Sequence, residues 1–145
     1  MQPFERQATL TWEGTLRAGE GVLRAGSGAY TLGLTFPSRV GPDEGRTSPE
    51  ELLASAHAAC YAMAIEATLA RRGASALRLH VSATIQGEFG EAGLVLRGSH
   101  LRVMADGLSG IDPSRFGDVA REAEARCPIS NVLRGNIRID VEAIA

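Results

Sequence analysis

Alternating apolar and polar residues predict strands near both ends of the chain and through its middle. Residues 7–35 hold short β-type runs separated by glycines, which predicts two or three antiparallel strands. Residues 77–87 and 94–105 alternate over much of their length, as half-buried strands do. We expect residues 87–93 to form the hairpin loop between these two strands, and residues 137–143 to form a closing strand.

A long helix is predicted to begin after Ser48. This residue can act as the N-cap, Pro49 suits the first helical position, and a glutamate at position 51 completes a Ser-x-x-Glu capping box. The helix should continue to about residue 72, where Gly73 supplies a stop signal. It contains the most apolar part of the chain.

A second helix is predicted over residues 113–126, with Asp112 as a candidate N-cap. A Cys-Pro pair interrupts this helix, and we expect a short helical turn over residues 129–135. Residues 37–46, in contrast, contain two prolines, two glycines and four charged residues, so we predict a loop there.

Composition limits the classes of function. A chain of 145 residues suits a single domain, residues 1–145, with an ordinary core. The net charge is −2 and the basic residues are scattered, which argues against nucleic acid or an anionic membrane surface as the main partner. Residues 52–70 could span a membrane by length, but they are mostly alanine and include His57 and Glu66, which favours a buried helix. The N-terminus lacks the features of a secretory signal, so we expect a cytoplasmic location.

The two cysteines, Cys60 and Cys127, are the first candidates for chemistry. They lie in no CxxC or Cys/His zinc spacing, which argues against a metal site, and a reducing compartment would permit only a transient disulfide. Cys60 is in the middle of a helix among small residues, so it can be either buried filler or a reactive thiol. Cys127 can cap the following turn, where free N–H groups favour a thiolate, so local physics makes it the more acidic thiol.

Three further side chains could support a reactive thiol. His57, three residues before Cys60, could act as a base or could be a hydrogen-bonded packing residue. Glu51 is used by the capping box, whereas Glu50 can pair with an arginine, and Arg39 in the preceding loop is the nearest candidate. Such an arginine would lower the pKa of a neighbouring thiol and stabilise charge on an oxygen leaving group.

Two long segments together carry a family resemblance: residues 47–64 (TSPEELLASAHAACYAMA) and residues 126–133 (RCPISNVL). They resemble the OsmC/Ohr family of organic hydroperoxide reductases. The resemblance extends to Thr11-Trp-Glu-Gly14 and to Ile111-Asp112, so it covers nearly the whole chain. The Trp-Glu-Gly start, the His-Ala-Ala-Cys run and an arginine before the helix are similar to the OsmC branch.

The resemblance implies a cysteine-based peroxidase that uses no metal or other cofactor. By position, its site residues are the peroxidatic Cys60, the resolving Cys127, the activating Arg39, for which Arg46 is the alternative, and the carboxylate partner Glu50. This assignment reverses the ranking of the thiols from local physics. The implied substrates are organic hydroperoxides, and the implied reductant is an external dithiol of the lipoyl type. No Gly-rich dinucleotide fingerprint occurs in the sequence, which agrees with such a reductant.

The resemblance also implies an α+β, OsmC-like fold, with mainly antiparallel sheets from two subunits wrapped around central helices. Glu50 and Cys60 are ten residues apart on one predicted helix, or roughly 15 Å along its axis. Glu50 must therefore act through a long arginine or on Cys60 of a partner chain, and we predict an intertwined homodimer with composite sites. Two alternatives remain open: a non-catalytic thiol redox sensor or stress-response binding protein, and a small-molecule binding module in which both cysteines only pack.

Overall fold

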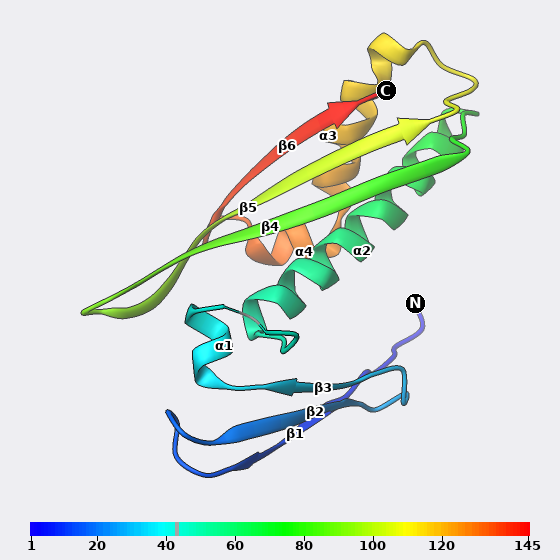
Figure 1. The fold of residues 1–145 in the computed structure, drawn as a ribbon. Coiled ribbons are helices and arrows are strands. Elements are labelled where there is room, and N and C mark those ends of the chain that lie inside the picture. The colour runs from blue at the N-terminus through cyan, green and yellow to red at the C-terminus, as the bar shows by residue number, and fades with distance from the viewer. Residues whose placement is uncertain (43) are drawn as a thin grey trace. The chain divides into compact units, whose positions relative to one another are not determined.

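The first of two units in the chain is a small antiparallel sheet with a short helix. The computed structural model describes residues 1–42 and 44–145, and it divides into the units Met1–Leu52 and Leu53–Ala145. Three strands, paired in the order β1-β2-β3, form the first sheet: β1 (Ala8–Glu13), β2 (Glu20–Ala25) and β3 (Thr31–Leu34) (Figure 1). The strands expected within residues 7–35 are confirmed, while the single domain over residues 1–145 stays a prediction.

The loop predicted for residues 37–46 is wrong at its start, because helix α1 spans Phe36–Val40. The backbone N–H of Ser38 donates to the Thr35 hydroxyl at 3.1 Å, and the Ser38 hydroxyl accepts from the Thr35 N–H at 3.0 Å. This reciprocal capping box stabilises one and a half turns that the surrounding prolines and glycines obscure in the sequence. Residue 43 of the stretch lies outside the described residues.

Helix α2 (Pro49–Arg71) begins and ends close to the predicted positions. The Ser48 hydroxyl accepts a hydrogen bond from the Glu51 N–H at 3.1 Å, which confirms the N-cap. At the other end Gly73 adopts a left-handed conformation with φ 67°, and the N–H that follows it donates to the Leu69 carbonyl at 2.9 Å. The glycine stop signal is therefore confirmed.

The second unit contains a sheet of two long strands and one short strand, in the order β4-β5-β6. These are β4 (Arg78–Gly90), β5 (Gly93–Asp106) and β6 (Arg138–Ile144). The first two are antiparallel, but β6 runs parallel to β5. The parallel pairing is possible because a helical connection carries the chain back across the sheet.

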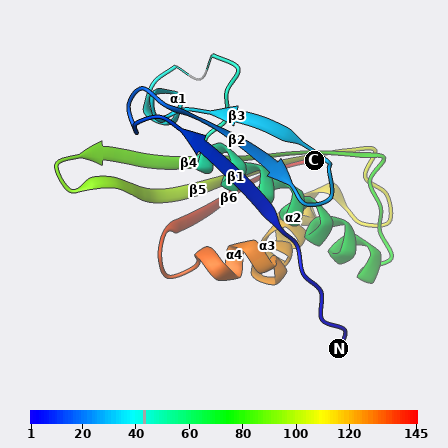
Figure 2. The same ribbon diagram turned by 90° about the horizontal axis from the view of Figure 1, so that it is seen from below.

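The hairpin predicted between these strands is confirmed, but its loop is shorter than residues 87–93. Strand pairing continues to Gly90 and Gly93, so only two residues form the turn. Gly93 has φ 91°, which a residue with a side chain adopts only at a cost. The hairpin consequently extends beyond the helices of this unit (Figure 2).

The predicted second helix and the turn after it are present in the connection between β5 and β6. A 3₁₀ turn, Pro113–Arg115, leads into α3 (Phe116–Arg126), and the Asp112 carboxylate accepts from the Ser114 N–H at 2.9 Å. After Cys127, α4 (Pro128–Leu133) forms the short helical turn.

The core of the second unit lies between helices α2 and α3 and one face of its sheet (Figure 1). Residues on alternate positions of β5 and at helical spacing on α3 are buried. The main contributors are Tyr61, Ile65, Leu69, Leu101, Val103, Phe116, Val119 and Ala123. Burial of these apolar side chains is the main force that stabilises the unit.

One face of α2 is buried in this core and the other face is exposed. The buried face consists of His57, Tyr61, Ile65, Thr68 and Leu69. The exposed face is mostly apolar, with Ala56, Ala59, Met63, Ala67 and Ala70, and it also carries Ser55 and Glu66. By length and composition alone α2 would also pass as a membrane-spanning helix. The buried face shows that it serves as a core helix of this unit.

Candidate functional site

Cys60 and Cys127 lie together in the second unit although they are far apart in the sequence. The Cys60 side chain on α2 interacts directly with the side chain of Cys127, the residue between α3 and α4. Cys60 is half-buried, Cys127 is fully buried, and both are free thiols. The structure therefore brings two sulfurs into contact, which is the arrangement that a reversible disulfide needs.

The start of α4 provides a backbone N–H group to the Cys60 thiol rather than to the Cys127 thiol. The backbone of Cys127 adopts the N-cap conformation that the sequence predicted, with φ −74° and ψ 116°, but its thiol makes no capping hydrogen bond. Instead the backbone N–H of Ile129 interacts with the Cys60 thiol. The sequence could not reveal this contact, because it depends on how α4 packs against α2.

The pKa of the Cys60 thiol is raised by burial, which disfavours the charged thiolate. The Ile129 N–H opposes this effect and lowers the pKa, whereas the neighbouring Cys127 thiol raises it further. Within the described residues, no cation is among the groups that set this pKa. Burial therefore favours the neutral Cys60 thiol, and a nearby positive charge would favour the thiolate.

His57 is a fully buried residue with a hydrogen bond at each ring nitrogen. Nδ1 lies 2.7 Å from the Ser99 hydroxyl of β5, and Nε2 lies 2.7 Å from the Ser130 hydroxyl of α4. Burial lowers the pKa of His57, and the Glu124 carboxylate only partly opposes the shift. The interpretation as a hydrogen-bonded packing residue is confirmed. Reasoning from the sequence did not identify Ser99 and Ser130 as partners of His57, although serines within apolar segments indicate buried hydroxyls that need hydrogen bonds.

Protonation of His57 is expected to destabilise the folded chain in mild acid. Because burial lowers its folded-state pKa, the unfolded chain takes up this proton first as the pH falls below about 6.5. The contribution of His57 is therefore complete above that pH and is lost as the pH falls toward the folded-state value. Urea unfolding of wild type and His57→Gln at pH 5 and pH 7.5 measures the difference.

The wild-type chain should lose more of its free energy of unfolding between these two pH values than His57→Gln does. His100, whose pKa is raised by the Asp140 carboxylate, contributes with the opposite sign but equally in both proteins. Equal losses in the two proteins would contradict the assignment.

Arg39 and Glu50 form an ion pair in the first unit. Arg39 Nη2 lies 2.7 Å from Glu50 Oε1, and its Nε lies 3.0 and 3.2 Å from the two carboxylate oxygens. The Glu50 carboxylate raises the pKa of Arg39, so the guanidinium stays charged. Arg46, the alternative arginine, pairs with Glu20 at 3.2 Å. The pairing expected for Glu50 is thus present in its Arg39 form.

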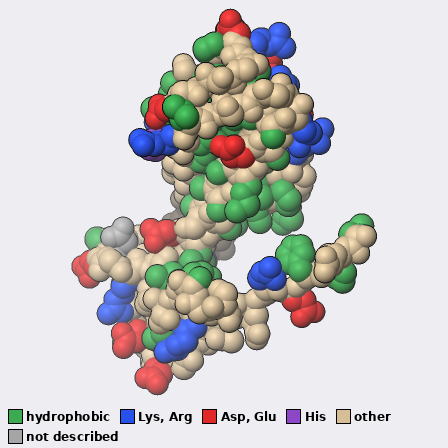
Figure 3. Space-filling view, turned by 90° about the vertical axis from the view of Figure 1, so that its right-hand side faces the viewer, with side chains coloured by type: hydrophobic (Ala, Val, Ile, Leu, Met, Phe, Trp, Pro, Cys, Tyr) green, Lys and Arg blue, Asp and Glu red, His purple; other side chains and the backbone are tan. Residues whose placement is uncertain are grey.

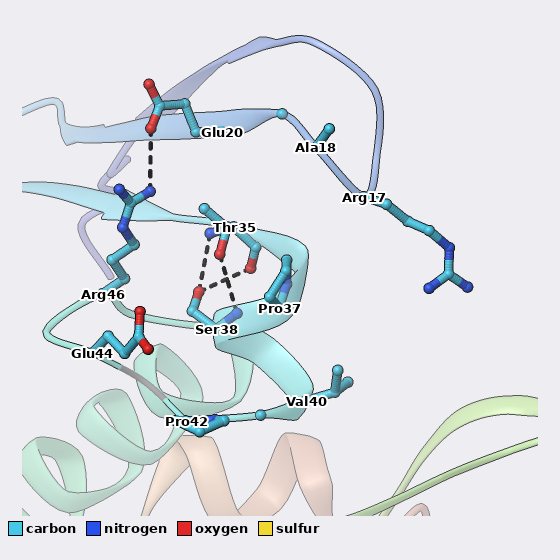
Figure 4. Close-up of a pocket in the computed structure, with 12 residues that line it drawn as sticks. Arg17, Ala18, Glu20, Thr35, Pro37, Ser38, Val40, Pro42, Glu44 and Arg46 are labelled. Atoms are coloured by element: carbon cyan, nitrogen blue, oxygen red, sulfur yellow. Dashed lines mark hydrogen bonds and ion pairs between the residues drawn. The ribbon is translucent and has the colours of Figure 1, made fainter.

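A pocket of about 570 Å³ also lies in the first unit (Figure 4). The ion pair of Arg46 with Glu20 borders it, as does the capping box of Thr35 and Ser38. Most of these polar groups are engaged with one another, and Arg39 is not among the lining residues. We assign no function to this pocket.

The predicted site residues therefore form two pairs, Cys60 with Cys127 and Arg39 with Glu50. The first pair belongs to the second unit and the second pair to the first unit. That the two pairs act together stays a prediction. Within residues 1–42 and 44–145, no group of three or more His, Cys, Asp or Glu residues is arranged to hold a metal ion.

Comparisons with known proteins agree on one family. A family model described as OsmC-like protein matches residues 41–142. Peroxiredoxin OsmC of Escherichia coli (strain K12) is 32% identical over 132 residues, which cover 90% of this chain and 91% of that protein. Organic hydroperoxide resistance protein-like 2 of Staphylococcus epidermidis is 28% identical over 119 residues, or 80% of this chain and 81% of that protein.

Solved structures show the same fold. An organic hydroperoxide resistance protein OsmC from Legionella pneumophila has a TM-score of 0.78 at 23% identity and covers 100% of both chains. An organic hydroperoxide resistance protein from Elizabethkingia anophelis has a TM-score of 0.79 at 22% identity, covering 99% of this chain and 97% of that one. These likenesses confirm the α+β fold that the sequence predicted.

Proposed function

The chain belongs to the OsmC-like protein family, and from this premise we propose that it is a thiol peroxidase that reduces organic hydroperoxides to alcohols. The observation that carries the proposal is the contact between the Cys60 and Cys127 thiols. Two cysteines that served only as packing would have no need to meet. A family relative at 32% identity bears the name peroxiredoxin, which supports the same class of chemistry.

In the first step, the Cys60 thiolate attacks the distal oxygen of the hydroperoxide. An S–O bond forms, the O–O bond breaks, and the departing alkoxide takes up a proton to become the alcohol. The product at Cys60 is a sulfenic acid. We propose that Arg39, held by Glu50, lowers the pKa of Cys60 and stabilises the alkoxide. The burial-raised pKa of Cys60 is the physical reason why such a cation is needed.

In the second step, Cys127 attacks the sulfenic acid sulfur of Cys60. An S–S bond forms, the S–O bond breaks, and the leaving hydroxide takes the thiol proton to give water. An external dithiol, of the lipoyl type in our proposal, then reduces the disulfide by thiol–disulfide exchange. The chain uses no nicotinamide cofactor in this scheme.

We further propose that two chains form a homodimer through the exposed apolar face of α2. An exposed helix face made mostly of apolar residues is typically covered by a partner, and Met63 on this face is 73% exposed in the single chain. Hydrophobic side chains also gather on the surface of the second unit in the space-filling view (Figure 3). A cytoplasmic location remains a prediction.

Sustained peroxide turnover is the test of the proposed function. Purified protein with cumene hydroperoxide and dihydrolipoamide or dithiothreitol should consume many equivalents of peroxide per chain, because each disulfide is reduced and used again. A redox sensor would also consume peroxide, but only about one equivalent per chain. Consumption that stops after the first equivalent, with reductant still in excess, would therefore favour the sensor.

A further inference from the structure

One buried hydrogen bond ties together the two segments that carry the cysteines. His57 lies three residues before Cys60 on α2, and Ser130 lies three residues after Cys127 at the start of α4. The distance from His57 Nε2 to the Ser130 hydroxyl is 2.7 Å, and neither side chain is exposed to solvent. Residues three apart in a helix lie on the same face, so this bond is about one turn from each sulfur.

The same ring is anchored from its other side. His57 Nδ1 lies 2.7 Å from the Ser99 hydroxyl of β5, which is also fully buried. A neutral imidazole has one N–H and one lone pair, so one serine hydroxyl accepts and the other donates. The ring therefore connects α4 to both α2 and the sheet. Because six residues are too few to form a stable helix alone, α4 depends on such contacts for its position.

We propose that His57 is a positioning residue that, through Ser130, holds Cys127 against Cys60 and sets the rate of disulfide formation. The inference rests on the proposed function, in which Cys127 attacks the Cys60 sulfenic acid and water leaves. That attack requires the two sulfurs in line with the breaking S–O bond, and a small misplacement of one reactant slows such a step strongly. His57 touches neither the substrate nor the bond that breaks, so its effect acts on geometry.

Ser130→Ala and Ser99→Ala are matched variants, because each removes one 2.7 Å hydrogen bond from the same buried ring. We expect similar losses in the free energy of unfolding. Rapid mixing with one equivalent of cumene hydroperoxide should show disulfide formation about tenfold slower in Ser130→Ala. In Ser130→Ala the rate of sulfenic acid formation should stay within about twofold of the wild-type rate. In Ser99→Ala the rates of both steps should stay within about twofold of wild type.

Two substitutions of His57 itself distinguish the hydrogen bond to Ser130 from the hydrogen bond to Ser99 in an independent experiment. A glutamine amide reaches the position of Nε2 and can bond Ser130, whereas an asparagine amide reaches the position of Nδ1 and can bond only Ser99. His57→Gln should retain most of the wild-type rate of disulfide formation, and His57→Asn should lose about tenfold. This pair keeps the test decisive if a serine variant fails to fold.

Oxidised glutathione provides a readout that needs no peroxide. Cys60 displaces one glutathione to form a mixed disulfide, and Cys127 then displaces the other. Ser130→Ala and His57→Asn should slow this second step by about tenfold. If wild type shows no peroxide turnover but this difference remains, the proposed function fails and the positioning role stands. Equal slowing by Ser130→Ala and Ser99→Ala, or slowing by neither, would overturn the positioning role.

Discussion

Cys60→Ser is expected to abolish dithiol-dependent turnover of cumene hydroperoxide, with a loss in kcat/KM of at least about 10³-fold. A serine hydroxyl is not ionised near neutral pH and cannot be oxidised to a sulfenic acid, so neither step of the cycle can begin. Peroxide consumption at low substrate concentration measures the loss. Because Cys60 is only half-buried, the replacement should leave the unfolding transition close to that of wild type. Retained turnover in a folded Cys60→Ser protein would show that Cys60 is not the nucleophile.

Cys127→Ser separates the two steps of the same cycle. Without added reductant, wild type should lose two thiols for each peroxide consumed, because the disulfide forms. Cys127→Ser should lose one thiol and gain the mass of a single oxygen atom, since its Cys60 sulfenic acid has no partner. The observed contact between the two thiols is the reason to expect this difference. Loss of both thiols to other products in wild type, with no internal disulfide, would instead support the view that Cys127 only packs.

The fold was predictable where a local signal dominates. The Ser48 cap and the Gly73 stop fixed the ends of α2, because each acts through hydrogen bonds within a few residues. Helix α1 was missed because a Thr35 and Ser38 capping box outweighs the prolines and glycines around it. The parallel pairing of β6 with β5 has no local signal, since it depends on the long connection between them.

The site was predictable in its members but not in its contacts. The spacing of Glu50 within the first turn of α2 left it available for an arginine, and its pairing with Arg39 is present. From the sequence alone, the free N–H groups at the start of α4 are expected to stabilise a Cys127 thiolate. In the structure, the Ile129 N–H interacts with the Cys60 thiol instead, because of how α4 packs. The Ile129 N–H lowers the pKa of Cys60, but burial outweighs this effect, so ionisation of the mid-helix thiol depends on a further positive charge.

Arg39→Met is expected to lower kcat/KM for cumene hydroperoxide by about 100-fold at pH 7. Burial raises the pKa of Cys60, and a nearby cation typically offsets such a shift by one to three units. The activity of Arg39→Met should therefore recover partly as the pH rises and the thiol ionises. Arg46→Met is the matched control, because Arg46 is also an exposed arginine paired with one glutamate. Equal losses in both variants would remove the specific role of Arg39.

Mixed dimers test whether Glu50 serves Cys60 of its own chain or of its partner. Glu50→Gln should be impaired because the neutral amide no longer fixes the Arg39 guanidinium, and Cys60→Ser should be inactive. If the sites are composite, a heterodimer contains one complete site, built from the Cys60 of one chain and the Glu50 of the other. Random exchange of equal amounts would then restore about a quarter of the wild-type sites. If both residues come from one chain, no complete site forms, and the mixture shows only the average of the two variants. The exposed apolar face of α2 makes the composite arrangement the one we expect, because a second chain that covers that face lies along the helix that carries both residues.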